Sequence, residues 1–162
     1  MIVVSNTSPI TNLAAIGQFN LLQFLFGELH VPEAVVAELS FGGVEWPGLL
    51  EINESEWVFT TVVKDRRLVE ALRLELDRGE AETIALALQL QADLVLIDEK
   101  PGRFAAQHFG LKVMGVVGMI VRAKQLGYIA ATRPSLDALR ETAGFYIDQA
   151  LYTRALELAS EF

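Results

Sequence analysis

Short apolar runs alternate along the chain with longer segments in which apolar residues recur at helical spacing. Residues 2–4, 57–63 and 93–97 have the β-branched and apolar composition of buried strands, and two briefer runs, 29–31 and 111–114, have the same character. Strands that alternate with helical segments are typical of an open sheet with parallel pairing. The pattern therefore predicts an α/β fold around a mainly parallel sheet.

The segments between these runs predict helices. Pro9 and Pro32 each stand where a helix begins, and Gly17 interrupts the first helical stretch. Residues 41–48, with three glycines and Pro47, predict a loop. We expect helices over residues 32–39, 66–77, 80–91, 103–109 and 115–126, and helical structure from Ser135 onward.

The C-terminal segment carries an apolar helical face. We divide the chain into a domain over residues 1–130 and a helical extension over 131–162 that docks either on the same domain or on a second subunit. An exposed apolar face of this kind favours a homodimer. The residues of the face are Ile147, Ala150, Leu151, Leu158 and Phe162.

Composition excludes several classes of protein. The chain has 162 residues, enough for one domain with a sizeable core, and 52% of them are hydrophobic. It has no Cys and two His, which excludes a disulfide framework, a thiol nucleophile and a conventional zinc hydrolase. The longest apolar run, residues 113–121, is about half a membrane span, so we expect no membrane segment and a cytoplasmic location.

Charge is distributed unevenly. The formal net charge is -8, and residues 1–63 contain seven Glu and no Lys or Arg. An acidic protein binds nucleic acid poorly unless a local basic surface or bridging metal ions compensate. The basic-free segment is also a suitable docking surface for a basic protein partner.

Polar residues follow two of the predicted strands. The first strand ends in Ser5-Asn6-Thr7-Ser8, and the strand over residues 93–97 ends in Asp98-Glu99. Ligands of open α/β sheets bind beyond the carboxyl ends of the strands. Glu38, Glu80 and Glu82 lie on helices that flank this edge. Together the acids predict a cluster of carboxylates that is suited to bind Mg²⁺ or Mn²⁺.

Each of these residues also has a structural interpretation. A single acid is more often a solvated charge or a helix cap, and Ser8 fits the first helix as its N-cap. Helical periodicity places Glu80 and Glu82 on opposite sides of one apolar stripe, so it does not choose between them as ligands. The position of Glu80 near the helix start favours Glu80. Lys100 and Arg103 follow Asp98 closely and are candidates for contacts with substrate phosphates.

Several motifs, taken in their order along the chain, resemble those of the PIN-domain family, in particular its short prokaryotic members. The resemblance covers about residues 1–130 and rests on ordered motifs that are weak individually. They are Val3-Val4-Ser5-Asn6-Thr7-Ser8-Pro9-Ile10, Val31-Pro32-Glu33-Ala34-Val35 through Glu38-Leu39, Gly79-Glu80-Ala81-Glu82 through Ala87, Leu96-Ile97-Asp98-Glu99 with Gly102-Arg103 and Ala106, and then Gly110-Leu111 and Gly115 to Gly127.

The resemblance implies a three-layer α/β/α sandwich, a Mg²⁺ or Mn²⁺ site and cleavage of single-stranded RNA. Many relatives are the toxin half of toxin-antitoxin pairs, which implies a basic antitoxin-like partner. Carried over by position, the acids of the family match Glu38, Glu80 or Glu82, Asp98 and Glu99. Thr7 or Ser8 matches the hydroxyl residue that follows the first acid.

The chain departs from the family at Asn6, which stands where the family has its first acid. An amide oxygen ligates a metal but brings no charge, so metal affinity should fall. One interpretation is an active ribonuclease with Glu38, Glu80 and Asp98 as catalytic residues. The alternative is a degenerate PIN fold that binds nucleic acid or protein without cleavage. A third interpretation, a receiver domain, conflicts with Ser5-Asn6, because that fold needs paired acids after its first strand.

Overall fold

The computed structural model describes residues 1–42 and 46–161. Within these ranges five strands form one parallel sheet in the order β3-β2-β1-β4-β5. Ser5 pairs with Leu96 in the register of β1 and β4, so the carboxyl ends of the two central strands lie side by side. The strands are β1 (Val3–Ser5), β2 (Leu29–Pro32), β3 (Val58–Thr61), β4 (Leu94–Leu96) and β5 (Val113–Met114).

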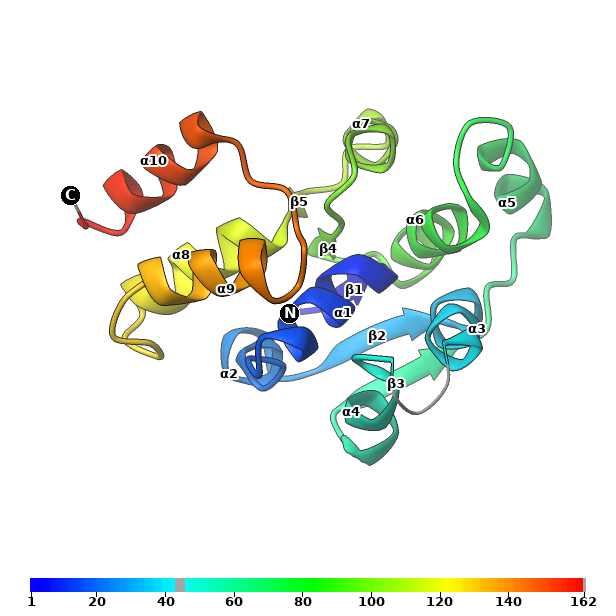
Figure 1. Cartoon of the computed structure of the whole chain (residues 1–162). Coiled ribbons are helices and arrows are strands. Elements are labelled where there is room, and N and C mark those ends of the chain that lie inside the picture. The colour runs from blue at the N-terminus through cyan, green and yellow to red at the C-terminus, as the bar shows by residue number, and fades with distance from the viewer. Residues whose placement is uncertain (43–45, 162) are drawn as a thin grey trace.

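Ten helices surround the sheet in the part of the chain that the structure describes (Figure 1). They are α1 (Thr7–Ala15), α2 (Leu21–Phe26), α3 (Glu33–Phe41), α4 (Leu49–Glu54), α5 (Arg66–Leu72), α6 (Arg78–Leu90), α7 (Lys100–His108), α8 (Val116–Gln125), α9 (Arg133–Glu141) and α10 (Gln149–Leu158).

The period of two along the strands creates the layers. Val3, Leu94 and Leu96 face one side of the sheet and share a core with α1, α2, α3, α8 and α9. Val4 and Val95 face the other side and pack against α5 and α6. The fold is therefore the three-layer α/β/α sandwich, and its sheet is entirely parallel within the described residues.

Several helix boundaries differ from the sequence predictions. The helix expected over 66–77 ends at Leu72, and Asp77 begins a new cap for α6. The helix expected at 103 starts at Lys100, because Glu99 takes the N-cap position and Pro101 follows in the first turn. Helix α4 was not predicted from the sequence. Within the loop predicted over residues 41–48, residues 43–45 lie outside the described part of the chain.

The C-terminal segment folds as two helices. Gly144, at φ +68°, lies between them in the left-handed region, and the Asp148 carboxylate accepts a hydrogen bond from Leu151 N to begin α10. Leu139 of α9 and Tyr152 of α10 belong to the same core as α8. Segment 131–161 thus packs on the same chain.

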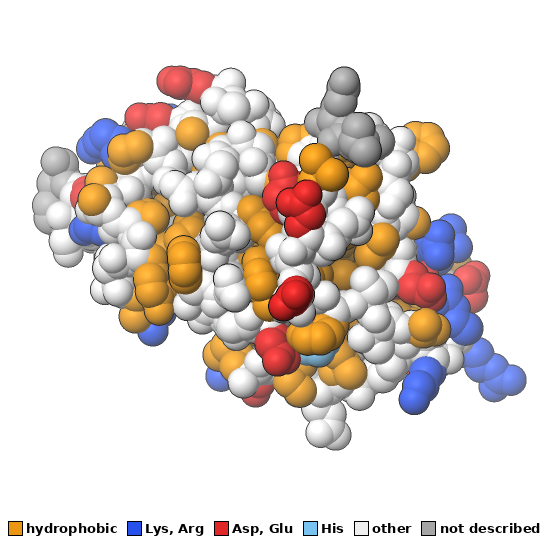
Figure 2. All heavy atoms as spheres, turned by 90° about the horizontal axis from the view of Figure 1, so that it is seen from below, with side chains coloured by type: hydrophobic (Ala, Val, Ile, Leu, Met, Phe, Trp, Pro, Cys, Tyr) orange, Lys and Arg blue, Asp and Glu red, His pale blue; other side chains and the backbone are white. Residues whose placement is uncertain are grey.

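The surface repeats the uneven charge of the sequence. Figure 2 shows the underside of the view in Figure 1, where acidic side chains lie among hydrophobic ones and Lys and Arg gather toward the edges. Glu28, Glu54 and Glu56 are exposed members of the N-terminal acidic set. Within the described residues, no helix is both long enough and apolar enough to cross a membrane.

Candidate metal centre

The two central strands place Asn6 at the carboxyl edge of the sheet. Asn6 N donates a hydrogen bond to Leu96 O at 2.9 Å, which joins the end of β1 to the end of β4. Asn6 is also the N-cap of α1, but its side chain makes no capping hydrogen bond. It is only 4% exposed, and its Oδ1 has no hydrogen-bond partner among the described residues. A buried acceptor without a donor is costly, and this oxygen is available to a ligand.

Glu38 of α3 reaches the same place. Thr7 Oγ1 donates a hydrogen bond to Glu38 Oε2 at 2.7 Å and orients this carboxylate. Gly79 of α6 leaves the space that the two side chains occupy. A Cβ atom at Gly79 would collide with Glu38 Oε1 and would lie 3.3 Å from Asn6 Oδ1. The Glu38 carboxylate and the Asn6 amide therefore converge on the start of α6.

Asp98 follows β4 and is fixed by two hydrogen bonds. Val116 N, at the start of α8, donates to Asp98 Oδ1 at 2.8 Å, and Ser8 Oγ donates to Asp98 Oδ2 at 3.3 Å. Asn12 donates in turn to Ser8 Oγ, at 3.0 Å. Ser8 thus positions Asp98, and Asn6 takes the N-cap position expected for Ser8. Burial raises the pKa of Asp98, and the two hydrogen bonds and the charge of Arg103 oppose that shift.

Glu80 lies in the first turn of α6, in a capping box with Asp77. Asp77 Oδ1 accepts from Glu80 N at 2.8 Å, and Glu80 Oε1 accepts from Asp77 N at 3.3 Å. Glu80 Oε2 has no partner among the described residues, although the residue is only 6% exposed. Gly102 of α7 leaves room for this oxygen, because a Cβ atom there would lie 2.6 Å from it. Burial, followed by the charge of Asp77, raises the pKa of Glu80 to about 7.

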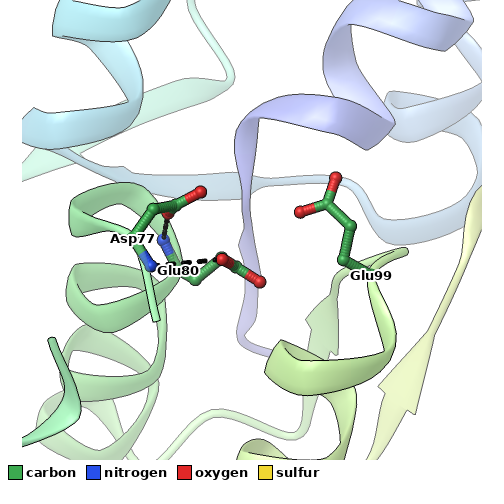
Figure 3. Close-up of side chains that lie close together, drawn as sticks. All are labelled: Asp77, Glu80 and Glu99. Atoms are coloured by element: carbon green, nitrogen blue, oxygen red, sulfur yellow. Dashed lines mark hydrogen bonds between the residues drawn. The ribbon is translucent and has the colours of Figure 1, made fainter. Parts of the chain in front are cut away.

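Asp77, Glu80 and Glu99 form a close group of acids. One carboxylate oxygen from each lies within 4.8 Å of the others. Figure 3 shows the side chains of Glu80 and Glu99 facing one another from the starts of α6 and α7. Burial and the charges of Asp77, Asp98 and Glu38, in that order, raise the pKa of Glu99. The charges of these acids therefore act on one another through Glu99. The five acids are Glu38, Asp77, Glu80, Asp98 and Glu99.

Asp77 was not among the candidate ligands predicted from the sequence. Its signal is the spacing of Asp77 and Glu80 ahead of an apolar helix, which is the sequence signature of a capping box. That signature marks a helix start but does not reveal that Glu99 of another helix lies opposite.

Glu82 lies in different surroundings. It is 1% exposed, and its carboxylate accepts hydrogen bonds from Ala34 N at 3.1 Å, from Arg66 at 3.3 Å and from Arg78 at 3.2 Å. Both oxygens are engaged, and two cations balance the charge. The structure thus separates Glu82 from the five acids and gives it a role in joining α3, α5 and α6.

The two basic residues selected from the sequence differ in their contacts. Arg103 Nη1 donates to Ile97 O at 3.1 Å, which holds the guanidinium beside the end of β4. Lys100 is exposed and makes no side-chain hydrogen bond or ion pair with the described residues.

The chemistry of this edge suits a hard divalent cation. Five carboxylates and one amide oxygen gather there, two buried oxygens lack donors, and Arg103 is the cation that acts on Asp98. Oxygen ligands with excess negative charge are those that Mg²⁺ and Mn²⁺ prefer. Asp77, Glu80 and Glu99 are close enough to share such an ion, and Asn6, Glu38 and Asp98 lie at the same edge of the sheet.

Comparison with known proteins gives a match at the level of the family. A family model described as a PIN domain matches residues 2–161, a range that includes both the sheet and the C-terminal helices. No curated protein matches the chain.

Proposed function

Since the chain belongs to the PIN-domain family, which has a nuclease-type fold, we propose that it is a metal-dependent endoribonuclease acting on single-stranded RNA. The observation that supports this proposal most strongly is the pair of buried oxygens without partners among the described residues, Asn6 Oδ1 and Glu80 Oε2. They lie among five acids whose negative charge exceeds the one positive charge that Arg103 brings to Asp98. A purely structural site would provide these oxygens with donors, as it does for Glu82.

In this proposal Asn6, Glu38, Glu80, Asp98 and Glu99 hold Mg²⁺ or Mn²⁺. An ion held by these residues would activate a water and stabilise the departing oxygen of the phosphodiester. Thr7 fixes the orientation of Glu38, and Ser8 with Val116 N fixes that of Asp98. These contacts organise the carboxylates in advance, so little reorganisation is needed when the ion binds.

Glu80 adds a proton site to this arrangement. With its pKa raised to about 7, it holds a proton at neutral pH for part of the time when no ion is bound. Loss of this proton on metal binding makes metal affinity rise with pH. Metal-dependent cleavage should therefore increase as the pH rises through 7.

The alternative function is a binding module without cleavage, and Asn6 is the observation that favours it. Asn6 removes one negative charge from the position of the first acid. Glu99 compensates in our proposal, because it lies in the same group as Glu80 and shares the field of Asp98 and Glu38.

The test is cleavage of a labelled single-stranded RNA in Mg²⁺ or Mn²⁺, with EDTA as the metal-free control. Asp98→Asn should lower the rate by about 100-fold or more, because the variant loses a charged ligand. Glu54→Gln, an exposed acid of α4, is the matched control and should cleave like the wild type. Absence of wild-type cleavage in both metals, with RNA binding retained, would favour the binding module.

A further inference from the structure

A groove begins beside Asp98 and runs between α8 and α10. Its volume is about 590 Å³, and its walls come from β5, from α7, α8 and α10, and from the segment that joins α9 to α10. In Figure 1, α10 lies alongside α8 at the end of the molecule opposite α5. The groove is therefore a surface of the C-terminal half that adjoins the proposed metal centre.

Positive charge is concentrated along this groove. Four basic side chains line it, namely those of Lys100, Arg103, Arg122 and Arg154. Among the described residues that line it, Asp98 is the sole acid, and it lies at the end nearest the metal centre. In a chain with a net charge of -8, such a grouping is a local basic surface of the kind that binding of a polyanion requires.

Few of these basic side chains are engaged by other groups of the protein. Lys100 and Arg122 make no side-chain hydrogen bond or ion pair with the described residues. Arg154 pairs with Glu157 at 3.5 Å, but both side chains are largely exposed, and such pairs contribute little. Arg122 and Arg154 are therefore available to bind phosphate.

The groove also offers apolar surface between its charges. Val117 and Val121 of α8 face Leu151 and Leu158 of α10, and Phe145 lies in the segment between α9 and α10. Unpaired bases expose apolar faces that pack on such side chains, whereas bases within a duplex are already stacked. The combination fits a single strand better than a duplex.

We infer that the α8–α10 groove binds the part of a single-stranded RNA that flanks the cleaved bond, with phosphates at Arg122 and Arg154 and a base against Phe145. This inference rests on the proposed function for its substrate. It adds where the RNA beyond the cleaved bond lies, namely in the groove and away from the acids. A polyanion positioned at Asp98 meets strong repulsion from the five acids, and the adjoining basic groove offsets it.

The experiment measures binding of a labelled single-stranded RNA by the full chain in EDTA, so that cleavage does not interfere. The variants are Arg122→Glu, Arg154→Glu and the double variant. Arg67→Glu, an exposed arginine of α5 outside the groove, is the charge-matched control. Affinity of the double variant should fall roughly tenfold or more, and the salt dependence of log affinity should become shallower by about 0.7 for each arginine removed. The control should fall far less.

The same proteins are then tested for cleavage and for oligomeric state. Weaker RNA binding by the groove variants supports the inference. If none of the proteins cleaves RNA, the ribonuclease proposal fails, but RNA binding by the groove is still supported. Unchanged binding and unchanged KM in the double variant would overturn the groove while cleavage by the wild type keeps the ribonuclease proposal intact. A change of oligomeric state by light scattering, with RNA binding unchanged, would also overturn it and identify the groove as a protein interface.

Discussion

Two buried glutamates of α6, two residues apart, lie in opposite electrostatic environments. Glu82 is bound by two arginines and a backbone amide. Glu80 faces Asp77 and Glu99, has an oxygen without a partner, and has its pKa raised to about 7. The two residues have nearly the same burial, yet we expect loss of Glu82 to destabilise the fold and the charge of Glu80 to lower stability at neutral pH.

This difference shows that burial alone does not identify a ligand. Both carboxylate oxygens of Glu82 accept hydrogen bonds, whereas Glu80 Oε2 has no donor among the described residues and faces other acids. In our proposal, an ion that binds this group of like charges offsets the cost of holding them together.

The largest effect on stability is expected from Glu82→Ala. This change leaves Ala34 N without its acceptor and Arg66 and Arg78 without their partner, so the free energy of unfolding should fall by about 2–3 kcal/mol. Chemical denaturation without metal is the measurement, and Glu54→Ala is the control for loss of an acid. A fall below about 0.5 kcal/mol would show that Glu82 does not join these helices.

A smaller effect of opposite sign is expected from Glu80→Gln in the absence of metal. The raised pKa means that the unfolded chain loses the Glu80 proton near pH 4.5, whereas the folded chain keeps it to about pH 7. Stability of the wild type should therefore fall as the pH rises through this range, because the folded state binds more protons there.

Glu80→Gln removes this penalty, so the variant should gain about 1–2 kcal/mol over the wild type at pH 8 and almost nothing below pH 4. Denaturation at several pH values gives the comparison. An equal gain at every pH would mean that the charge of Glu80 is not the cause.

A further effect is expected from Asn6→Asp, which restores an acid at the end of β1. The additional charge should lower the Mn²⁺ concentration needed for half-maximal cleavage by about threefold to tenfold. It should also lower metal-free stability, because one more acid joins Glu38 and Asp98. An unchanged Mn²⁺ requirement would place Asn6 outside the metal site.

The smallest change in stability is expected from Gly79→Ala. The added Cβ displaces the Glu38 carboxylate, which is the flexible end of a side chain, while alanine favours the helix, so stability should change by about 0.5 kcal/mol or less. Cleavage should nevertheless fall by about threefold, because Glu38 no longer converges with Asn6. Unchanged cleavage would show that the position of Glu38 is unimportant.

Much of the fold was predictable because strand and helix periodicities are local properties. The apolar runs at 2–4 and 93–97 and the family motifs give the order of elements, and parallel pairing places Asn6 beside Asp98 at one edge. Boundaries were less predictable: the extent of α5 depends on Asp77, which caps the next helix. Short α4 has little periodic signal to reveal it.

The candidate site was predictable only as a set of residue types. Spacing along α6 does not separate Glu80 from Glu82, because the arginine that engages Glu82 from α5 is distant in sequence. The proximity of Asp77 to Glu99, and the basic groove beside α10, likewise depend on how separate helices pack. Such contacts belong to tertiary structure and leave no trace in a local pattern.

The most direct test of the account is calorimetric titration of the full chain with Mn²⁺ at neutral pH. The wild type and Glu82→Gln should bind Mn²⁺, whereas Glu80→Gln and Asp98→Asn should bind at least about tenfold more weakly. Binding to the wild type should also release protons, because Glu80 must lose its proton. Equal Mn²⁺ binding by the wild type and Glu80→Gln, without proton release, would contradict the central claim that these acids form a metal site.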